Sequence, residues 1–190
     1  MLIWLVIAAY LLGSIPFGLI VAGIWNVDIR RHGSGNIGAT NVLRTLGPVP
    51  AAAVFALDFS KGLLAVYLGY WSGGGPLIVL LLGAAAVLGH MYSIFLKFKG
   101  GKGAATGLGV LAGLAPEVFA ISLVVAAVII YATRYVSVGS IVTPFVAAGL
   151  MLLFHRPLPY IIGTLIVGLF ILVRHLPNIQ RLRRGTEARI

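Results

Sequence analysis

Residues 33–44, GSGNIGATNVLR, combine glycine with polar and basic side chains in a pattern suited to binding a phosphate. Gly33, Gly35 and Gly38 permit a tight turn in which successive backbone N–H groups converge on one anion. The hydroxyl, amide and guanidinium groups of the same segment can add hydrogen bonds to that anion. The alternative is a turn that binds nothing, in which glycine is present only because the backbone conformation requires it. We favour the phosphate site because the glycines are joined here to so many polar groups.

The second half of this segment predicts a short helix. Thr40 or Asn41 is expected to begin it and the Gly-Pro pair at 47–48 to end it, so that its first N–H groups point at the phosphate. Arg44 follows Thr40 by one helical turn and can add a forked, charge-assisted contact. Ser140, near the start of a later apolar stretch, offers a further hydroxyl to the same anion.

A second glycine-rich segment, residues 98–106 with sequence FKGGKGAAT, surrounds one lysine. It is not a Walker A loop, because the required glycine spacing is missing and no strand precedes it. The glycines leave Lys102 uncrowded at the start of a short apolar stretch, and its compact ammonium suits a substrate phosphate. Lys97 and Lys99 are interpreted as anchors at the membrane surface. Lys102 could be a third anchor, but we favour a binding role for it.

A third polar segment, residues 174–182 with sequence RHLPNIQRL, contains a histidine and an asparagine. His175 and Asn178 share a face if the chain stays near-helical, although Pro177 disfavours helical geometry at the residue before it. Both side chains can donate or accept hydrogen bonds and so grip a polyol or a phosphate. His175 is also a candidate general base. Packing at a helix end is the alternative for a lone histidine.

The composition indicates what kind of secondary structure must position these three polar segments. The chain has 190 residues, of which 60% are hydrophobic and 9% charged, and its mean hydropathy is +1.07. A soluble domain of this length needs far more polar surface, so the sequence predicts an all-α integral membrane protein. The net charge of +10 favours anionic lipids or substrates. Nucleic acid is disfavoured because the basic residues lie between apolar stretches. The absence of cysteine excludes disulfides and thiolate chemistry.

Seven apolar stretches are long enough, or nearly so, to cross a bilayer. They are residues 2–25, 48–71, 76–96, 104–116, 117–134, 139–154 and 158–175. Ser14, Pro16 and Gly18 predict a bend in the first. The short fourth stretch is tolerable only if one of its ends lies in a protein-lined, water-accessible cleft. We expect one membrane-embedded domain over 1–190.

The basic residues predict the orientation of these seven spans. If the N-terminus is outside, twelve of the 14 Lys and Arg residues fall inside. They are Arg30, Arg31, Arg44, Lys97, Lys99, Lys102, Arg134, Arg174, Arg181, Arg183, Arg184 and Arg189. The outside loops hold only Arg156, and Lys61 lies within a span. Cytoplasmic loops are enriched in Lys and Arg, so we expect the N-terminus outside, the C-terminus inside and all three polar segments at the cytoplasmic face.

Two opposite charges, Asp58 and Lys61, lie three residues apart inside the second apolar stretch. Charges at such depth are costly unless they are paired or face a polar cavity. We expect them to neutralise each other, with a proton or ion path as the alternative. His32, His90 and His155 are spread over different loops and helix ends without metal-ligand spacing, so no metal site is predicted.

Segments 34–44, 100–106 and 174–182, in this order, resemble the bacterial acyl-phosphate–glycerol-3-phosphate acyltransferase (PlsY) family. The likeness covers nearly the whole chain and includes GSIP at 13–16, LDF and KG within 57–62, and LGH at 88–90. The family implies seven membrane helices with the N-terminus outside and the C-terminus inside, as the charge count also predicts. Two positions depart from the family's pattern: Ser93 stands where proline is frequent, and Ala104 replaces a frequent valine.

The resemblance implies transfer of a long fatty acyl group from acyl phosphate to the 1-hydroxyl of glycerol 3-phosphate. The products would be lysophosphatidic acid and phosphate, in the first acylation of phospholipid synthesis, at the cytoplasmic face of the bacterial inner membrane. No cofactor or metal is implied. A phosphate acyltransferase that makes acyl phosphate would be a transient partner.

The family's motifs also imply which residues bind the two substrates. Acyl phosphate would be held by Gly38, Ala39, Thr40, Asn41 and Ser140. Glycerol 3-phosphate would be held by the catalytic set Ser34, Arg44, Lys102, His175 and Asn178. Because acyl phosphate is already activated, the reaction needs no protein nucleophile, and a donor phosphate oxygen can accept the hydroxyl proton. A transporter or scramblase of phosphorylated molecules or lipids is the main alternative, and a non-catalytic lipid-binding scaffold is another. The short, nearly uncharged outside loops argue against transport.

Overall fold

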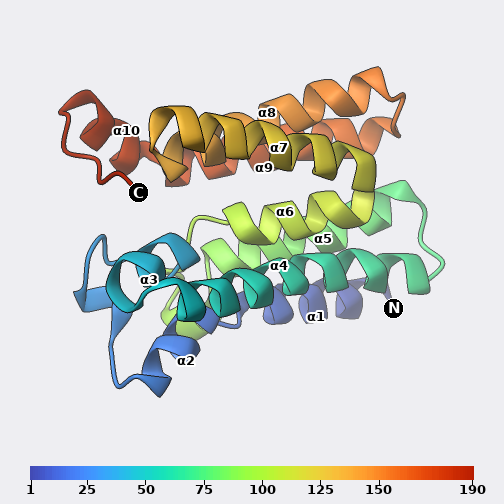
Figure 1. Cartoon of the computed structure of the whole chain (residues 1–190). Helices are drawn as coiled ribbons and strands as arrows, with labels where there is room; N and C mark the ends of the chain where they lie inside the picture. The colour runs from blue at the N-terminus through green and yellow to red at the C-terminus, as the bar shows by residue number, and fades with distance from the viewer. The chain divides into compact units, whose positions relative to one another are not determined.

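In a computed structural model that describes all 190 residues, the chain is entirely helical. The α-helices are α1 (Leu2–Ser14), α2 (Phe17–Ile24), α3 (Ala39–Leu46), α4 (Pro48–Trp71), α5 (Pro76–Met91), α6 (Ala104–Leu114), α7 (Pro116–Thr133), α8 (Val136–Leu153), α9 (Leu158–Arg174) and α10 (Leu176–Arg183). Two short 3₁₀ helices are η1 (Ile29–Arg31) and η2 (Ile94–Leu96). The helices form two compact units, residues 1–110 and 111–190 (Figure 1). That the chain is one domain stays a prediction.

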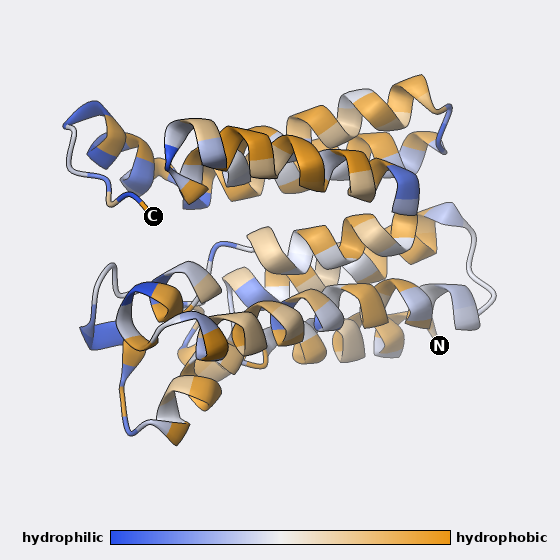
Figure 2. Ribbon diagram, in the orientation of Figure 1, coloured by the Kyte–Doolittle hydropathy of each residue, from blue (hydrophilic) through white to orange (hydrophobic).

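Five segments are long and apolar enough to cross a membrane. They are residues 2–24, 48–71, 76–96, 116–133 and 136–153. The pair α9–α10, bent by 54°, makes a sixth if it is counted as one span, and α6 is shorter. Apolar residues cover most of these helices, and polar residues gather at their ends (Figure 2). The predicted all-α class is therefore confirmed, whereas seven spans and their orientation stay predictions.

The first span is broken, as predicted, where α1 gives way to α2 at Pro16, which lacks the N–H that would continue the helix. Two carbonyls at this break accept hydrogen bonds from side chains elsewhere in the first unit. Ser14 O accepts from Ser93 Oγ at 2.6 Å, and Ile15 O accepts from Lys61 Nζ at 3.0 Å. Ser93 thus supplies a hydroxyl that a proline at this position would not.

Close glycine contacts hold the helices of the first unit together. A Cβ at Gly13 would lie 2.1 Å from Ala86 O, so α1 and α5 meet backbone to backbone. A Cβ at Gly62 would lie 2.1 Å from Thr106 O, so α4 and α6 do the same. Small residues permit such close approach in membranes, where lipid is as apolar as the side chains. Within this unit α2, α3 and the start of α6 lie at one end of the helices, and Met1 lies at the other (Figure 1).

The second unit is built on α7, α8 and α9, with α8 packed against both of the others. Pro144 stands inside α8 and Gly168 of α9 lies against it, where a Cβ would be 2.9 Å from the proline Cβ. At one end of the unit Glu117 and Arg156 form an ion pair. At the opposite end α10 and the C-terminus lie where α7 ends and α8 begins (Figure 1).

Candidate active site

The predicted short helix is present as α3, which begins at Ala39 with Gly38 as its N-cap. Its start is one or two residues before Thr40 or Asn41, and it ends as predicted at Gly47, where φ is 89°. The first N–H groups of a helix have no partner within it, and they form the positive end of its dipole. The half-buried turn before α3 therefore offers backbone amides to an anion.

Asn41 orders the loop before α3 from the inside. Its side chain is 1% exposed. The Nδ2 amide donates to the carbonyls of Ile29, His32 and Asn36 at 3.3, 3.0 and 2.9 Å, and Oδ1 accepts from the N–H of Ser34 at 2.9 Å. Both ends of the amide are thus occupied by loop backbone. Direct binding of acyl phosphate by this residue stays a prediction.

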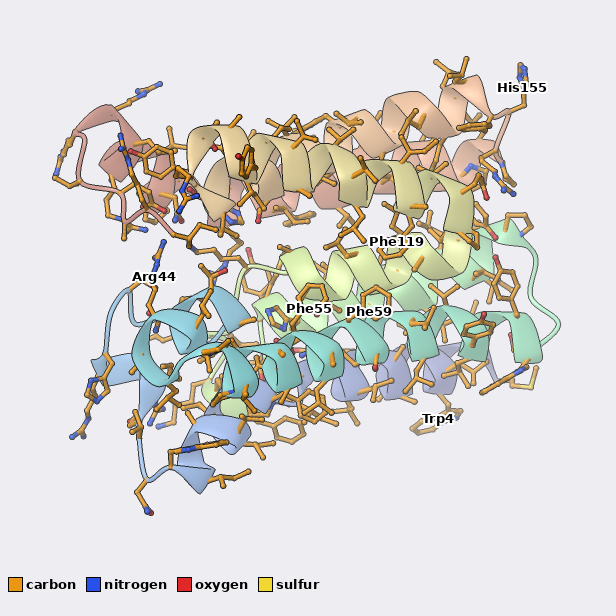
Figure 3. All side chains as sticks on the ribbon, viewed as in Figure 1. Trp4, Arg44, Phe55, Phe59, Phe119 and His155 are labelled. Carbon is orange, nitrogen blue, oxygen red and sulfur yellow. The ribbon has the colours of Figure 1, made fainter.

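The same loop explains why Gly33 is glycine. Its φ is +56°, and a Cβ there would lie 2.3 Å from Asn41 Oδ1. A side chain at this position would therefore break the contact that orders the turn. Ser34 is exposed beside it, and Arg44 is exposed on α3, from which its side chain extends outward (Figure 3).

The loop that carries Lys102 is pinned to the end of α5. The N–H groups of Gly100 and Gly101 donate to the carbonyls of Met91 and His90, both at 3.0 Å. A Cβ at Gly100 would lie 2.0 Å from His90 O, so only glycine fits. Lys102 is half-buried just before α6.

The flanking lysines differ from Lys102. Lys97 and Lys99 are exposed, as expected of surface anchors. Leu96, just before them, packs against the cluster that contains Ile37 and Val42. One apolar cluster of the first unit thus joins the turn before α3 to the segment that precedes Lys102.

His175 lies at the junction of α9 and α10 and is 4% exposed. Its Nδ1 is 2.8 Å from Ile171 O. A carbonyl can only accept, so Nδ1 carries the proton and, in the neutral ring, the acceptor lone pair is on Nε2. The helix resumes at Leu176 despite Pro177, because proline is tolerated in the first turn of a helix.

Asn178 is held by an acid that the sequence analysis did not single out. Its Nδ2 donates to Glu187 Oε1 at 2.7 Å, and Arg181 Nε donates to Oε2 at 2.7 Å. Glu187 is 7% exposed. Burial raises the pKa of this carboxyl, but the hydrogen bonds from Asn178 and Arg181 outweigh burial and hold the pKa below its ordinary value. The signal in the sequence was a lone acid within a basic C-terminal segment.

The C-terminal tail that carries Glu187 is fastened to the loop between α7 and α8. Ile190 N donates to Arg134 O at 3.0 Å, and Arg134 Nε donates back to Ile190 O at 2.9 Å. Ser137 and Ser140 lie one turn apart at the start of α8. The second unit therefore gathers Ser140, His175 and Asn178 at one of its ends.

The family model described as glycerol-3-phosphate acyltransferase matches residues 3–185. The chain belongs to this family. It is 47% identical to glycerol-3-phosphate acyltransferase 2 of Moorella thermoacetica, over 98% of this chain and 97% of that protein. It is also 47% identical to the glycerol-3-phosphate acyltransferase of Geobacter sulfurreducens, over 95% and 93% of the two chains.

Two solved structures share the fold of this acyltransferase family member. Both are crystal structures of PlsY, an integral membrane glycerol 3-phosphate acyltransferase. The glycerol 3-phosphate form matches with a TM-score of 0.96 and 43% identity, covering 100% of this chain and 95% of the other. The lysophosphatidic acid form matches with a TM-score of 0.94 and 42% identity over the same shares. The PlsY resemblance is confirmed, and with its apolar helices the chain is a multi-pass membrane protein.

One feature of this acyltransferase was predicted only in part. Asp58 and Lys61 do touch, with Oδ1 and Nζ 2.7 Å apart and side chains 2% and 1% exposed. His90, which the sequence left unassigned, lies on α5 with Nδ1 3.4 Å from the same Asp58 oxygen. The three residues do not form a metal site, and no group of three or more His, Cys, Asp or Glu side chains in the chain is arranged to hold a metal ion.

Proposed function

We propose that this chain transfers a fatty acyl group from acyl phosphate to the 1-hydroxyl of glycerol 3-phosphate, giving lysophosphatidic acid and inorganic phosphate. The observation that carries the proposal is the full-length match, with a TM-score of 0.96 and 43% identity, to PlsY in its glycerol 3-phosphate form. An acyl phosphate made by a phosphate acyltransferase is the donor.

In this proposal the polar residues identified in the sequence bind the two substrates. From the first unit, the turn at Gly38, Ala39 and Thr40 binds the donor phosphate through backbone amides, and Asn41 holds that turn in shape. Ser140 is a further ligand of the donor, and glycerol 3-phosphate is bound by Ser34, Arg44, Lys102, His175 and Asn178. The cationic groups offset the charge of two phosphorylated reactants.

The chemistry proceeds without a protein nucleophile. The 1-hydroxyl oxygen forms a bond to the acyl carbonyl carbon, and the bond from that carbon to the bridging phosphate oxygen breaks. The hydroxyl proton passes to a non-bridging oxygen of the departing phosphate. The protein contributes by orienting the hydroxyl and by stabilising charge on the leaving group with N–H donors and cations.

In this scheme His175 binds and orients glycerol 3-phosphate. Its Nδ1–H donates to Ile171 O, which fixes the ring and leaves the lone pair of the neutral imidazole on Nε2. Asn178 is oriented in the same way by Glu187. If His175→Gln abolished turnover and left the affinity for glycerol 3-phosphate unchanged, His175 would instead be the general base.

The orientation belongs to the proposal as well. Seven spans, an outside N-terminus and an inside C-terminus place the three polar segments at the cytoplasmic face of the inner membrane, where soluble glycerol 3-phosphate is available. The acyl chain remains in the bilayer during transfer, which suits helices whose outer surfaces are apolar.

The test is to incubate the purified protein with palmitoyl phosphate and glycerol 3-phosphate and to measure phosphate release and lysophosphatidic acid. Lys102→Ala and Arg44→Ala should each lower kcat/KM at least about tenfold, because each removes a charge-assisted contact. Lys99→Ala, which removes an exposed lysine of the same loop, should stay within about twofold, as expected of a surface residue. Palmitoyl-CoA should not replace palmitoyl phosphate. Movement of phosphorylated solutes across liposomes without acylation would contradict the proposal.

A further inference from the structure

A buried polar cluster in the first unit has no part in the proposed chemistry. It consists of Asp58 and Lys61 on α4 and His90 on α5, which are 2%, 1% and 4% exposed. The Asp58 carboxylate is 2.7 Å from Lys61 Nζ and 3.4 Å from His90 Nδ1. Replacing a buried ion pair by apolar residues is often neutral or stabilising. Stability alone therefore does not explain why these three residues are polar. The groups that the cluster contacts indicate its function.

On one side the cluster holds the break between α1 and α2. Lys61 Nζ donates to Ile15 O at 3.0 Å and lies 5.6 Å from the centre of the Phe17 ring. Asp58 and Ile15 thus fix the lysine from two directions. Because Lys61 is held in this way, it in turn fixes the position of the Asp58 carboxylate, which faces His90.

On the other side the cluster supports the loop that carries Lys102. The carbonyl of His90 accepts from the N–H of Gly101 at 3.0 Å, and a Cβ at Gly101 would lie 2.2 Å from His90 Nε2. The edge of the imidazole therefore packs against the backbone of the residue just before Lys102. A shift of the ring would displace this backbone directly.

We propose that Asp58, Lys61 and His90 are positioning residues for Lys102. Lys61 fixes the Asp58 carboxylate, the carboxylate fixes the His90 ring, and the ring with its backbone carbonyl sets the conformation in which the loop presents the Lys102 ammonium to glycerol 3-phosphate. The inference rests on the proposed role of Lys102 in binding this substrate. It assigns the buried charges to loop geometry rather than to a proton or ion path.

Two variants separate positioning from folding. His90→Asn keeps a polar group near the position of Nδ1 but removes the ring edge beneath Gly101. Breaking only one partner of a buried ion pair is strongly destabilising, so the second variant replaces both partners at once, as Asp58→Leu with Lys61→Met. Each should raise KM for glycerol 3-phosphate about tenfold, as expected for residues coupled in one network, with KM for palmitoyl phosphate changed less than about twofold. His155→Asn, an exposed histidine in the loop between α8 and α9, is the matched control and should leave both constants unchanged.

A double-mutant cycle shows whether the effect passes through Lys102. Glycerol 3-phosphate binding is measured by calorimetry for the full chain, His90→Asn, Lys102→Ala and the double variant. In the Lys102→Ala background, His90→Asn should weaken binding less than about twofold, because the group that it positions is already gone. An unchanged effect in that background, a KM that rises equally for both substrates, or failure of all the cluster variants to fold would each overturn the proposal. The cycle measures binding of glycerol 3-phosphate and does not require turnover, so its outcome is independent of the proposed function. The proposed function fails if the unaltered chain does not turn over palmitoyl phosphate.

Discussion

At the scale of single residues, Asn41 and Glu187 hold other groups of the protein in place. Asn41 satisfies three carbonyls and one N–H of the loop before α3. Glu187 orients two side chains, because it accepts hydrogen bonds from both Asn178 and Arg181. Groups that bind phosphate must be held in place before it arrives, and in the proposed site Asn41 and Glu187 have this role.

Asn41→Ala should destabilise the protein and weaken donor binding. The change leaves buried loop carbonyls and the Ser34 N–H without their partner, at a cost of about 2 kcal/mol. We expect a lower Tm in detergent and a raised KM for palmitoyl phosphate. Asn26→Gly is the control, because Asn26 is exposed with a φ of 56° that glycine adopts readily. A variant with unchanged Tm and KM would show that the loop does not need this amide.

At the scale of helices, the sequence located most elements to within a few residues. Apolar length and helix-ending Gly and Pro identify α3, α4, α7 and the break at Pro16. The 54° bend between α9 and α10 and the return of the C-terminal tail were not predicted. The return of the tail depends on hydrogen bonds between residues distant in sequence, such as Arg134 with Ile190. No local pattern encodes such contacts, and for the same reason His90 and Glu187 were missed.

The docking of the tail onto α10 should depend on pH through Glu187. Its folded-state pKa is lowered, so the stabilisation is complete above the ordinary glutamate pKa of 4.5 and is lost as the pH falls through the folded value. At pH 7 we expect Glu187→Gln to have a lower Tm than the unaltered chain.

The difference in Tm between the two proteins should shrink as the pH is lowered below 4.5. Thermal scans across this range measure it, with Arg183→Ala, which removes an exposed residue of α10, as the control. A difference that is the same at every pH would mean that the Glu187 charge does not hold the tail.

At the scale of the whole molecule, the asymmetric charge predicts the orientation of the chain in the bilayer. The net charge is +10, and only one basic residue, Arg156, falls in a predicted outside loop. Placing the opposite ends of these helices in the cytoplasm would put most of the Lys and Arg residues outside, against the general bias. The predicted orientation therefore rests on composition, whereas the geometry of the site depends on contacts that composition does not specify.

The orientation can be tested directly because the chain has no cysteine of its own. We choose Gly75→Cys, where a Cβ meets nothing within 4 Å, for the predicted outside, and Lys99→Cys and Arg183→Cys, both at exposed positions, for the predicted inside. In bacterial spheroplasts a membrane-impermeant thiol reagent should label Gly75→Cys at once and label the other two only after permeabilisation. Retained activity shows that each variant is folded. The reverse pattern would place Lys102 and Asn178 outside, away from cytoplasmic glycerol 3-phosphate, and the proposed reaction could not occur there.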